Sequence, residues 1–185
     1  IVEQRIARSE QCIQIFRSIQ IERALIHFEH TNAREILVDR IGVVAQSHAV
    51  VENLFRDVIG AGVDPSRVAK KKHGTGGAWT EISEKDYPAF IGAGDGCVIG
   101  GTAWDFANDA RVPRGALDLL VIEEAGQFCL ANTIAVAPAS TNLLLLGDPQ
   151  QLPQVSQGTH PEPVDASALG WLVDGSNTLP EERGY

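Results

Sequence analysis

Acidic residues follow two short apolar runs in the middle of the 185-residue chain. Residues 117–122 end at Glu123 and Glu124, and residues 143–146 end at a glycine and Asp148. An apolar run that stops abruptly at polar residues is typical of a buried parallel strand that ends at the ligand-binding edge of its sheet. Carboxylates at such an edge can hold a metal ion that is bound to a phosphate. We therefore predict that the three acids converge at one edge of a parallel sheet.

Other segments have the patterns expected of the elements that would position these acids. The predicted elements are strands at 41–45, 97–101, 117–122 and 143–146 and helices at 49–59, 128–137 and 166–173. The first strand, a polar turn with Ser47 and His48, and the helix after it form a βα unit, whose turn lies on the ligand edge. Residues 128–137 fit the crossover helix that two consecutive parallel strands need. The fold class is therefore α/β.

Two parts of the chain have less regular patterns. Residues 1–40 carry apolar residues at helical spacing and predict an N-terminal helical segment, separate from a main domain at 41–185. Residues 60–96 are rich in glycine and predict an extended excursion with short helices. The lysine run 70–72 in this excursion is either a solvated face or, beside Trp79, a contact for phosphates.

Composition limits the classes of protein to which the chain can belong. The 24 acidic and 15 basic residues give a net charge of −9, which argues against a basic coat for nucleic acid but allows a local positive groove. Three widely spaced cysteines indicate neither a disulfide framework nor a zinc site. No apolar run approaches the roughly 20 residues of a membrane helix, and the N-terminus lacks a signal-peptide pattern. We expect a cytoplasmic protein with no membrane partner.

Four stretches, taken in chain order, resemble motifs of the first motor domain of superfamily 1 helicases. They are VVAQSHAVVENL, VIGGTAW, VIEEAGQ and LLGDPQQLPQ. The similarity is strongest to the DNA and RNA helicases related to the nonsense-decay helicase, some of them fused to a nuclease, and covers residues 41–185, about four-fifths of the chain. It implies a RecA-like fold of the P-loop NTPase superfamily, with a parallel sheet flanked by helices. It also implies an ATP hydrolase that moves along single-stranded DNA or RNA.

The resemblance assigns roles to the residues after the third predicted strand. Glu123 stands where the family holds water-coordinated Mg²⁺, Glu124 where it activates the attacking water, and Gln127 at the phosphate-facing glutamine. The family normally has aspartate at the first of these positions. Because Mg²⁺ requires nearly ideal octahedral geometry, the longer arm of Glu123 is expected to weaken magnesium binding.

The resemblance also assigns roles to the residues after the fourth predicted strand. Gly147 and Asp148 match the start of the family's Gly-Asp-x-x-Gln-Leu-Pro motif, which binds the nucleotide. The glutamine of that motif, Gln151, senses the γ-phosphate of ATP and couples the nucleotide to the nucleic-acid surface. These positions complete the predicted ATP-facing set.

A third group of positions resembles the motifs that contact single-stranded nucleic acid. Ser47 and His48 follow the first predicted strand, and Thr102 follows the double glycine of the second. On the residues alone, Thr102 is equally well explained as part of an ordinary tight turn. The choice between DNA and RNA stays open.

No GxxxxGK[ST] phosphate-binding loop occurs in the sequence. The family places this loop before the strand at 41–45, near residues 30–31, so either the loop is deleted or its residues are missing from the chain. Without its lysine and backbone amides, the β- and γ-phosphates lose their main cradle, and we expect poor nucleotide binding. The resemblance implies a second motor domain after the C-terminal LPEERGY, and we expect the 185 residues alone to be an inactive fragment of a helicase.

Two alternatives belong to other functional classes. A degenerate nucleic-acid-binding or scaffold module without ATPase activity would explain the missing loop and the glutamate at 123. A metal-dependent nuclease would use Glu123, Glu124 and Asp148 directly in a two-metal site. The nuclease leaves the accompanying glycine and glutamines unexplained, which the ATPase accounts for.

Overall fold

The computed structural model describes residues 39–74, 76–94, 96–151, 160 and 163–173. The chain divides into two units, Ile1–Ile36 and Leu37–Tyr185, and every described residue belongs to the second. Residues 1–38 of the predicted N-terminal helical segment lie outside the described residues. The last residue of that segment, Arg40, is the first residue of a strand.

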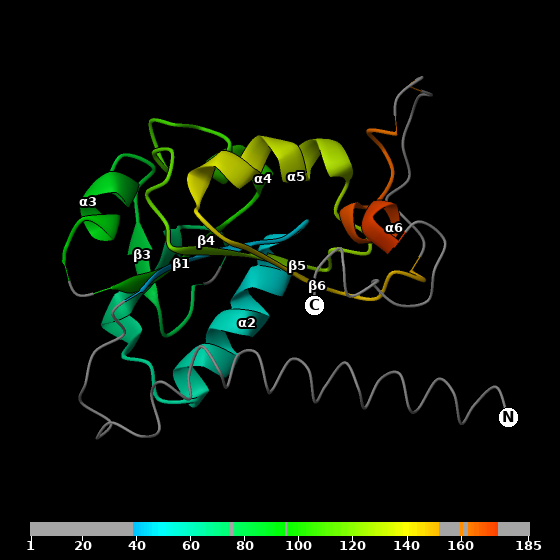
Figure 1. Cartoon of the computed structure of the whole chain (residues 1–185). Helices are drawn as coiled ribbons and strands as arrows, with labels where there is room; N and C mark the ends of the chain where they lie inside the picture. Colours follow the sequence, from blue (N-terminus) through cyan, green and yellow to red (C-terminus); the bar gives the residue numbers. More distant parts are fainter. Residues whose placement is uncertain (1–38, 75, 95, 152–159, 161–162, 174–185) are drawn as a thin grey trace, which may run out of the picture. The chain divides into compact units, whose positions relative to one another are not determined.

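Six parallel strands form one sheet in the order β3-β2-β4-β1-β5-β6 (Figure 1). The strands are β1 (Arg40–Val44), β2 (Val68–Lys71), β3 (Thr80–Ile82), β4 (Cys97–Gly101), β5 (Leu119–Glu123) and β6 (Leu143–Leu146). The four predicted strands are confirmed as β1, β4, β5 and β6, with β5 starting two residues later than predicted. The predicted α/β class with a parallel sheet is therefore correct.

The central strands end level with one another. Val44, the last residue of β1, pairs with Gly101 of β4 and with Ile122 of β5. Glu123, the last residue of β5, pairs with Leu146, the last of β6. Because all strands run in the same direction, the residues that follow β1, β4, β5 and β6 meet at one carboxyl edge of the sheet.

Helices cover both faces of the sheet, with α2 on one face and α4 and α5 on the other (Figure 1). The helices are α2 (His48–Gly60), α3 (Tyr87–Ile91), α4 (Ala103–Phe106), α5 (Leu130–Val136) and α6 (Ala168–Val173), with 3₁₀ turns η1 (Pro65–Arg67) and η2 (Ala137–Ala139). The predicted helices are confirmed as α2, α5 and α6. None of the helices in the described part of the chain has the length and apolar composition needed to cross a lipid bilayer.

Two adjacent glycines allow helices to approach β4 closely from both sides. A Cβ atom on Gly100 would lie 2.5 Å from the ring of Phe55 on α2. A Cβ atom on Gly101 would lie 2.8 Å from the carboxylate of Asp105 on α4. Successive residues of a strand face opposite sides of the sheet, so the glycine pair serves one helix on each face.

The expectation of an irregular excursion at 60–96 is wrong in part, because this segment supplies β2, β3 and α3. The lysine run also differs from both of its interpretations. Lys70 lies in β2, is 1% exposed and places Nζ 2.6 Å from the carboxylate of Glu52 on α2. Lys71 pairs with Glu84 and Asp105, and only Lys72 has a largely exposed side chain.

The buried ammonium group of Lys70 lies over the ring of Trp79. Trp79 is buried, with the Lys70 Nζ atom 5.9 Å and the Arg56 guanidinium carbon 5.8 Å from its ring centroid. Phe55 packs edge-on against Trp79 at 5.6 Å. A cation over an indole face is stabilised by the ring quadrupole, which together with Glu52 explains how Lys70 is accommodated inside the sheet–helix interface.

Replacing Lys70 is expected to destabilise the domain. Lys70→Ala leaves the largely buried carboxylate of Glu52 without its ammonium partner and should lower the free energy of unfolding by about 2–3 kcal/mol in urea denaturation. The matched control is Lys72→Ala, because Lys72 is 76% exposed and lies 3.6 Å from Glu81. Equal effects of the two substitutions would contradict the role given to the buried pair.

Candidate functional site

Three glutamines connect the ends of three neighbouring strands. The side-chain amide of Gln46, after β1, donates to the backbone carbonyl of Gln127, after β5, at 3.0 Å. The amide of Gln127 donates to the side-chain oxygen of Gln151, after β6, at 3.2 Å. The structure thus brings together the predicted residues Gln127 and Gln151. Gln46 was missed, although its place in the polar turn directly after a strand was a signal for it.

The loops after β5 and β6 touch through their backbones. The backbone N–H of Ala125 donates to the carbonyl of Leu146 at 2.8 Å, which extends the β5–β6 pairing beyond the strands. A Cβ atom on Gly147 would lie 2.8 Å from the nitrogens of Ala125 and Gly126. A Cβ atom on Gly126 would overlap the carbonyl oxygen of Asp148. Both glycines are therefore required by close approach of the two loops.

Glu124 has a left-handed backbone, with φ of 57°, and is the only non-glycine residue with positive φ in the described ranges. This conformation costs an L-residue on the order of 1–2 kcal/mol. The carbonyl of Glu124 accepts hydrogen bonds from the N–H groups of Gln127 at 2.8 Å and Phe128 at 3.0 Å, which close the turn. Backbone strain of this kind concentrates at functional sites, so the turn at Glu124 belongs to the candidate site.

The other two acids occupy different environments. Glu123 is buried at the end of β5. The Asp148 carboxylate accepts from the N–H of Gln150 at 2.8 Å and so closes its own turn. Among the described residues, no three His, Cys, Asp or Glu side chains are arranged to hold a metal ion. Glu123, Glu124 and Asp148 lie at one edge but do not form the ligand cluster that the nuclease alternative needs.

Ser47 and His48 begin the helix that follows β1. The Ser47 side chain caps α2 by accepting from the N–H of Val50 at 3.4 Å. The His48 ring stacks on His73, with ring centroids 4.1 Å apart and planes 27° apart. Burial, together with the nearby charge of Lys70 and the neighbouring His73, lowers the pKa of His48. His48 is consequently neutral at neutral pH, so it contributes an aromatic surface rather than a positive charge.

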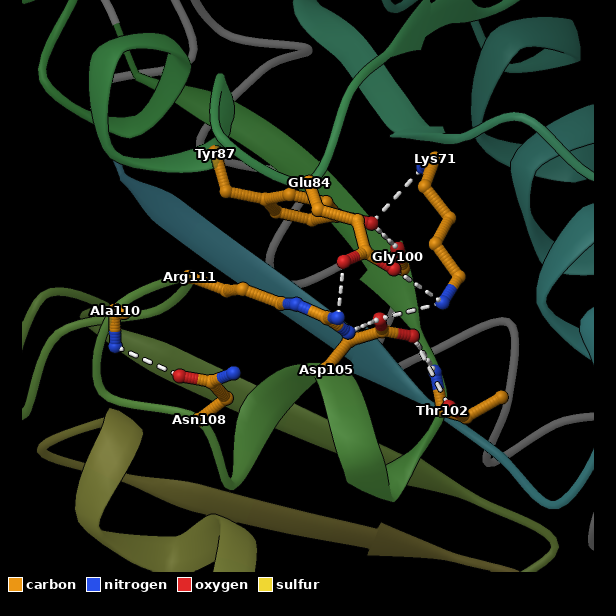
Figure 2. A network of polar contacts seen from close by, with 9 residues as sticks. All are labelled: Lys71, Glu84, Tyr87, Gly100, Thr102, Asp105, Asn108, Ala110 and Arg111. Carbon is orange, nitrogen blue, oxygen red and sulfur yellow. Dashed lines mark hydrogen bonds and ion pairs between the residues drawn. The ribbon is translucent and has the colours of Figure 1, made fainter.

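Thr102 is tied to a buried carboxylate on the first turn of α4 (Figure 2). Asp105 accepts from the backbone N–H of Thr102 at 2.9 Å and from its hydroxyl at 3.0 Å. Asp105 also forms ion pairs with Arg111 at 2.7 Å and Lys71 at 3.1 Å. Both hydrogen-bond donors of Thr102 are therefore used inside the protein. The Thr-x-x-Asp spacing of a helix N-terminus was the signal for Asp105, which sequence reasoning missed.

Further polar contacts fix the partners of Asp105. Glu84 pairs with Arg111 and, at 3.2 Å, with Lys71 (Figure 2). The Tyr87 hydroxyl accepts from the backbone N–H of Lys71 and donates to the carbonyl of Gly100, both at 2.9 Å. Burial raises the pKa of Tyr87, so its hydroxyl stays protonated and keeps its donor role. The network joins β2, α3, β4 and α4 at the carboxyl edge.

The predicted site residues thus fall into two groups at one edge of the sheet. The group after β5 and β6 contains Glu123, Glu124, Gln127, Gly147, Asp148 and Gln151, and the group after β1 and β4 contains Ser47, His48 and Thr102. Gln46 connects the first group to the turn that starts the second. No protein-family model matches the chain, and no curated protein matches it significantly.

The contact between the two loops is testable at Gly126. Gly126→Ala is expected to force the loops apart, because the obstructing atom belongs to the backbone of Asp148 and has little freedom to move. The free energy of unfolding should fall by about 1–3 kcal/mol, measured by thermal and urea denaturation. Gly60→Ala is the control, since nothing lies within 4 Å of a Cβ atom at that position. An unaffected Gly126→Ala variant would refute the close approach.

Asp105 makes stability depend on pH. Burial raises its pKa, but the bonds from Thr102 and Lys71 outweigh burial and leave the pKa below its ordinary value. Asp105 therefore stabilises the fold above about pH 4, and this contribution is lost as the pH falls further. Asp105→Asn should lower the free energy of unfolding by about 2–3 kcal/mol at pH 7.

The same substitution should lower the free energy of unfolding by less in acid. There the wild-type Asp105 side chain is protonated and therefore uncharged, as asparagine is at every pH. Urea denaturation of both proteins from neutral to acidic pH tests this convergence. Asp109→Asn is the matched control, because the carboxylate of Asp109 is exposed and pairs only with the exposed Arg114 among the described residues. A difference between wild type and Asp105→Asn that stays constant across this pH range would refute the assignment.

Proposed function

We propose that the chain is the first motor domain of a superfamily 1 helicase, with a RecA-like fold, that couples ATP hydrolysis to movement along single-stranded DNA or RNA. The observation that carries the proposal is the hydrogen bond between Gln127 and Gln151. It joins two motifs that lie 24 residues apart, on loops that are locked together through Gly126 and Gly147. The all-parallel sheet with helices on both faces is compatible with this fold.

The acids of the first group suit a magnesium nucleotide. Mg²⁺ usually keeps several waters and takes one or two carboxylates together with phosphate oxygens, so a dedicated three-carboxylate cage is not needed. Glu123 at the strand end and Asp148 on the neighbouring loop would supply oxygen ligands of this kind. Bound Mg²⁺ would neutralise charge that develops on the phosphates. Glu124, partly exposed on its strained turn, would accept the proton of the attacking water.

The glutamines offer a route from the nucleotide to the nucleic acid. In the proposed motor, Gln151 would report the state of the γ-phosphate and pass a change in position to Gln127 through their hydrogen bond. Gln127 holds Gln46, which immediately precedes Ser47 and His48. A chain of packed polar contacts is a physical means of coupling two sites. The second motor domain of the parent chain would close over the nucleotide on this edge.

A degenerate nucleic-acid-binding or scaffold module is the second candidate. The lack of a GxxxxGK[ST] loop in the sequence favours it, as does glutamate rather than aspartate at position 123. For a motor, the phosphate-gripping lysine and amides have to be supplied by residues other than these 185. Supplying a GxxxxGK[ST] loop ahead of β1 separates the two candidates, because only the motor gains Mg-ATP binding. Glu123→Asp should strengthen that binding further.

The role of Glu124 is tested in the chain that carries the supplied loop and is fused to a second motor domain, because the proposed motor needs both for hydrolysis. Glu124→Gln is expected to leave Mg-ATP affinity unchanged and to lower strand-stimulated ATP hydrolysis by at least about 100-fold, the usual contribution of a general base. Fluorescent-nucleotide anisotropy measures the binding, and phosphate release measures the hydrolysis. Asp109→Asn, at an exposed ion pair outside the predicted site residues, is the control. Normal hydrolysis by Glu124→Gln would refute the general-base role of Glu124, whereas no Mg-ATP binding by the loop-bearing chain would favour the scaffold.

A further inference from the structure

Trp104 is the most exposed large apolar side chain among the described residues, at 83%. It lies in the first turn of α4, three residues after the end of β4 and two after Thr102. Trp104 therefore lies at the carboxyl edge. The strand next to β4 is β1, which is followed by Ser47 and His48. Single exposed apolar residues are common on protein surfaces, so exposure alone does not indicate a ligand.

The neighbours of Trp104 hold it outward. Asp105 and Phe106, the next two residues of α4, are both buried. Phe106 packs into the main hydrophobic core, and Asp105 is held by Lys71 and Arg111. Turning the indole inward would require both of these residues to leave their places. The backbone of Trp104 is thus held in place by its two buried neighbours, and the indole stays on the outside of α4.

The ion-pair network that includes the neighbour of Trp104 carries no net charge. Lys71 and Arg111 pair with Glu84 and Asp105, so two cations balance two carboxylates. The whole chain, in contrast, carries −9. This network therefore neither attracts nor repels a phosphate backbone through a net charge of its own.

The hydrogen bonds of Thr102 limit the contacts that this residue can make with a nucleic acid. Both of its donors are engaged by Asp105, so it has no hydrogen to give to a phosphate without breaking the start of α4. The surface that remains available next to it is the face of Trp104. Aromatic faces bind unstacked bases of any sequence, because every base has a π surface.

We propose that Trp104 is a stacking platform for a base of single-stranded nucleic acid at the carboxyl edge of β4. The identity of the ligand rests on the proposed function, whereas the platform itself rests on the exposure of the indole and on its place at the carboxyl edge. The contact is indifferent to sequence and does not depend on neutralising a phosphate. It adds a hydrophobic contact to an edge where Ser47 and Thr102 both use their hydroxyl groups internally.

The test is binding of a fluorescently labelled oligothymidylate or oligouridylate of about 12 nucleotides, within the length range bound by single-strand-binding sites. Anisotropy titrations with the 185-residue chain compare wild type, Trp104→Ala and Trp104→Phe. Trp104→Ala should weaken binding by roughly 5- to 150-fold, the equivalent of about 1–3 kcal/mol per stacked base, and Trp104→Phe should keep most of the affinity. Trp171→Ala is the control, since Trp171 is 51% exposed but lies on α6.

Salt dependence separates stacking from phosphate contact. The slope of log affinity against log salt counts released counterions, so Trp104→Ala should lower affinity at every salt concentration without changing the slope. An unchanged thermal midpoint is expected as well, because the indole packs against little of the fold.

The outcomes distinguish this inference from the proposed motor. If Trp104→Ala weakens binding while the loop-bearing chain fails to bind Mg-ATP, the platform stands and the motor is wrong. If Mg-ATP binding follows the proposal but Trp104→Ala binds the oligonucleotide as wild type does, the platform is wrong and the motor stands. Failure of the wild-type chain to bind either oligonucleotide overturns the platform whatever the nucleotide measurements give.

Discussion

The backbone contact between the loops after β5 and β6 sets the geometry of the candidate nucleotide side. Gly126 and Gly147 remove the side chains that would separate these loops. As a result, Gln127 and Gln151 come within hydrogen-bond distance, and the acids of both loops share one edge. The parallel sheet determines that the loops leave on the same side, but only the glycine contact determines how close they come. Fold and site are thus specified by different residues, large aliphatic ones for the strands and glycines for the loops.

A second constraint holds the other half of the edge. Asp105 is a buried charge, and it is stable there because Thr102, Lys71 and Arg111 surround its carboxylate. The same contacts start α4 and connect it to β2. A chain of net charge −9 therefore uses several of its cations internally, as partners for buried or half-buried carboxylates. Lys70 and Lys71 of β2 therefore have a structural role, as partners of carboxylates inside the domain.

The strands that could be predicted from the sequence are those whose buried residues form a continuous apolar run. β1, β4, β5 and β6 have this pattern, and the polar residues at their ends were placed correctly at the carboxyl edge. β2 escaped detection because Lys70 is buried by pairing with Glu52, and a pair on another element leaves no local pattern. Gln46 contacts Gln127 across 81 residues, a distance at which composition and spacing carry no information. The hydroxyl of Thr102 could be located from sequence, but its engagement by Asp105 depends on the tertiary network.

Glu124 is the residue at which the turn after β5 departs from the strand, and its backbone is left-handed. Glycine would adopt this conformation without strain, so a sequence selected only for ease of folding would place glycine there. A glutamate at this point lowers stability locally, and the surrounding hydrogen bonds to its carbonyl and the interlocked loops offset the loss. The turn therefore stores a small amount of conformational energy at a residue that carries a carboxylate. At this one residue an unfavourable backbone conformation persists because the hydrogen-bonded turn and the interlocked loops hold it in place.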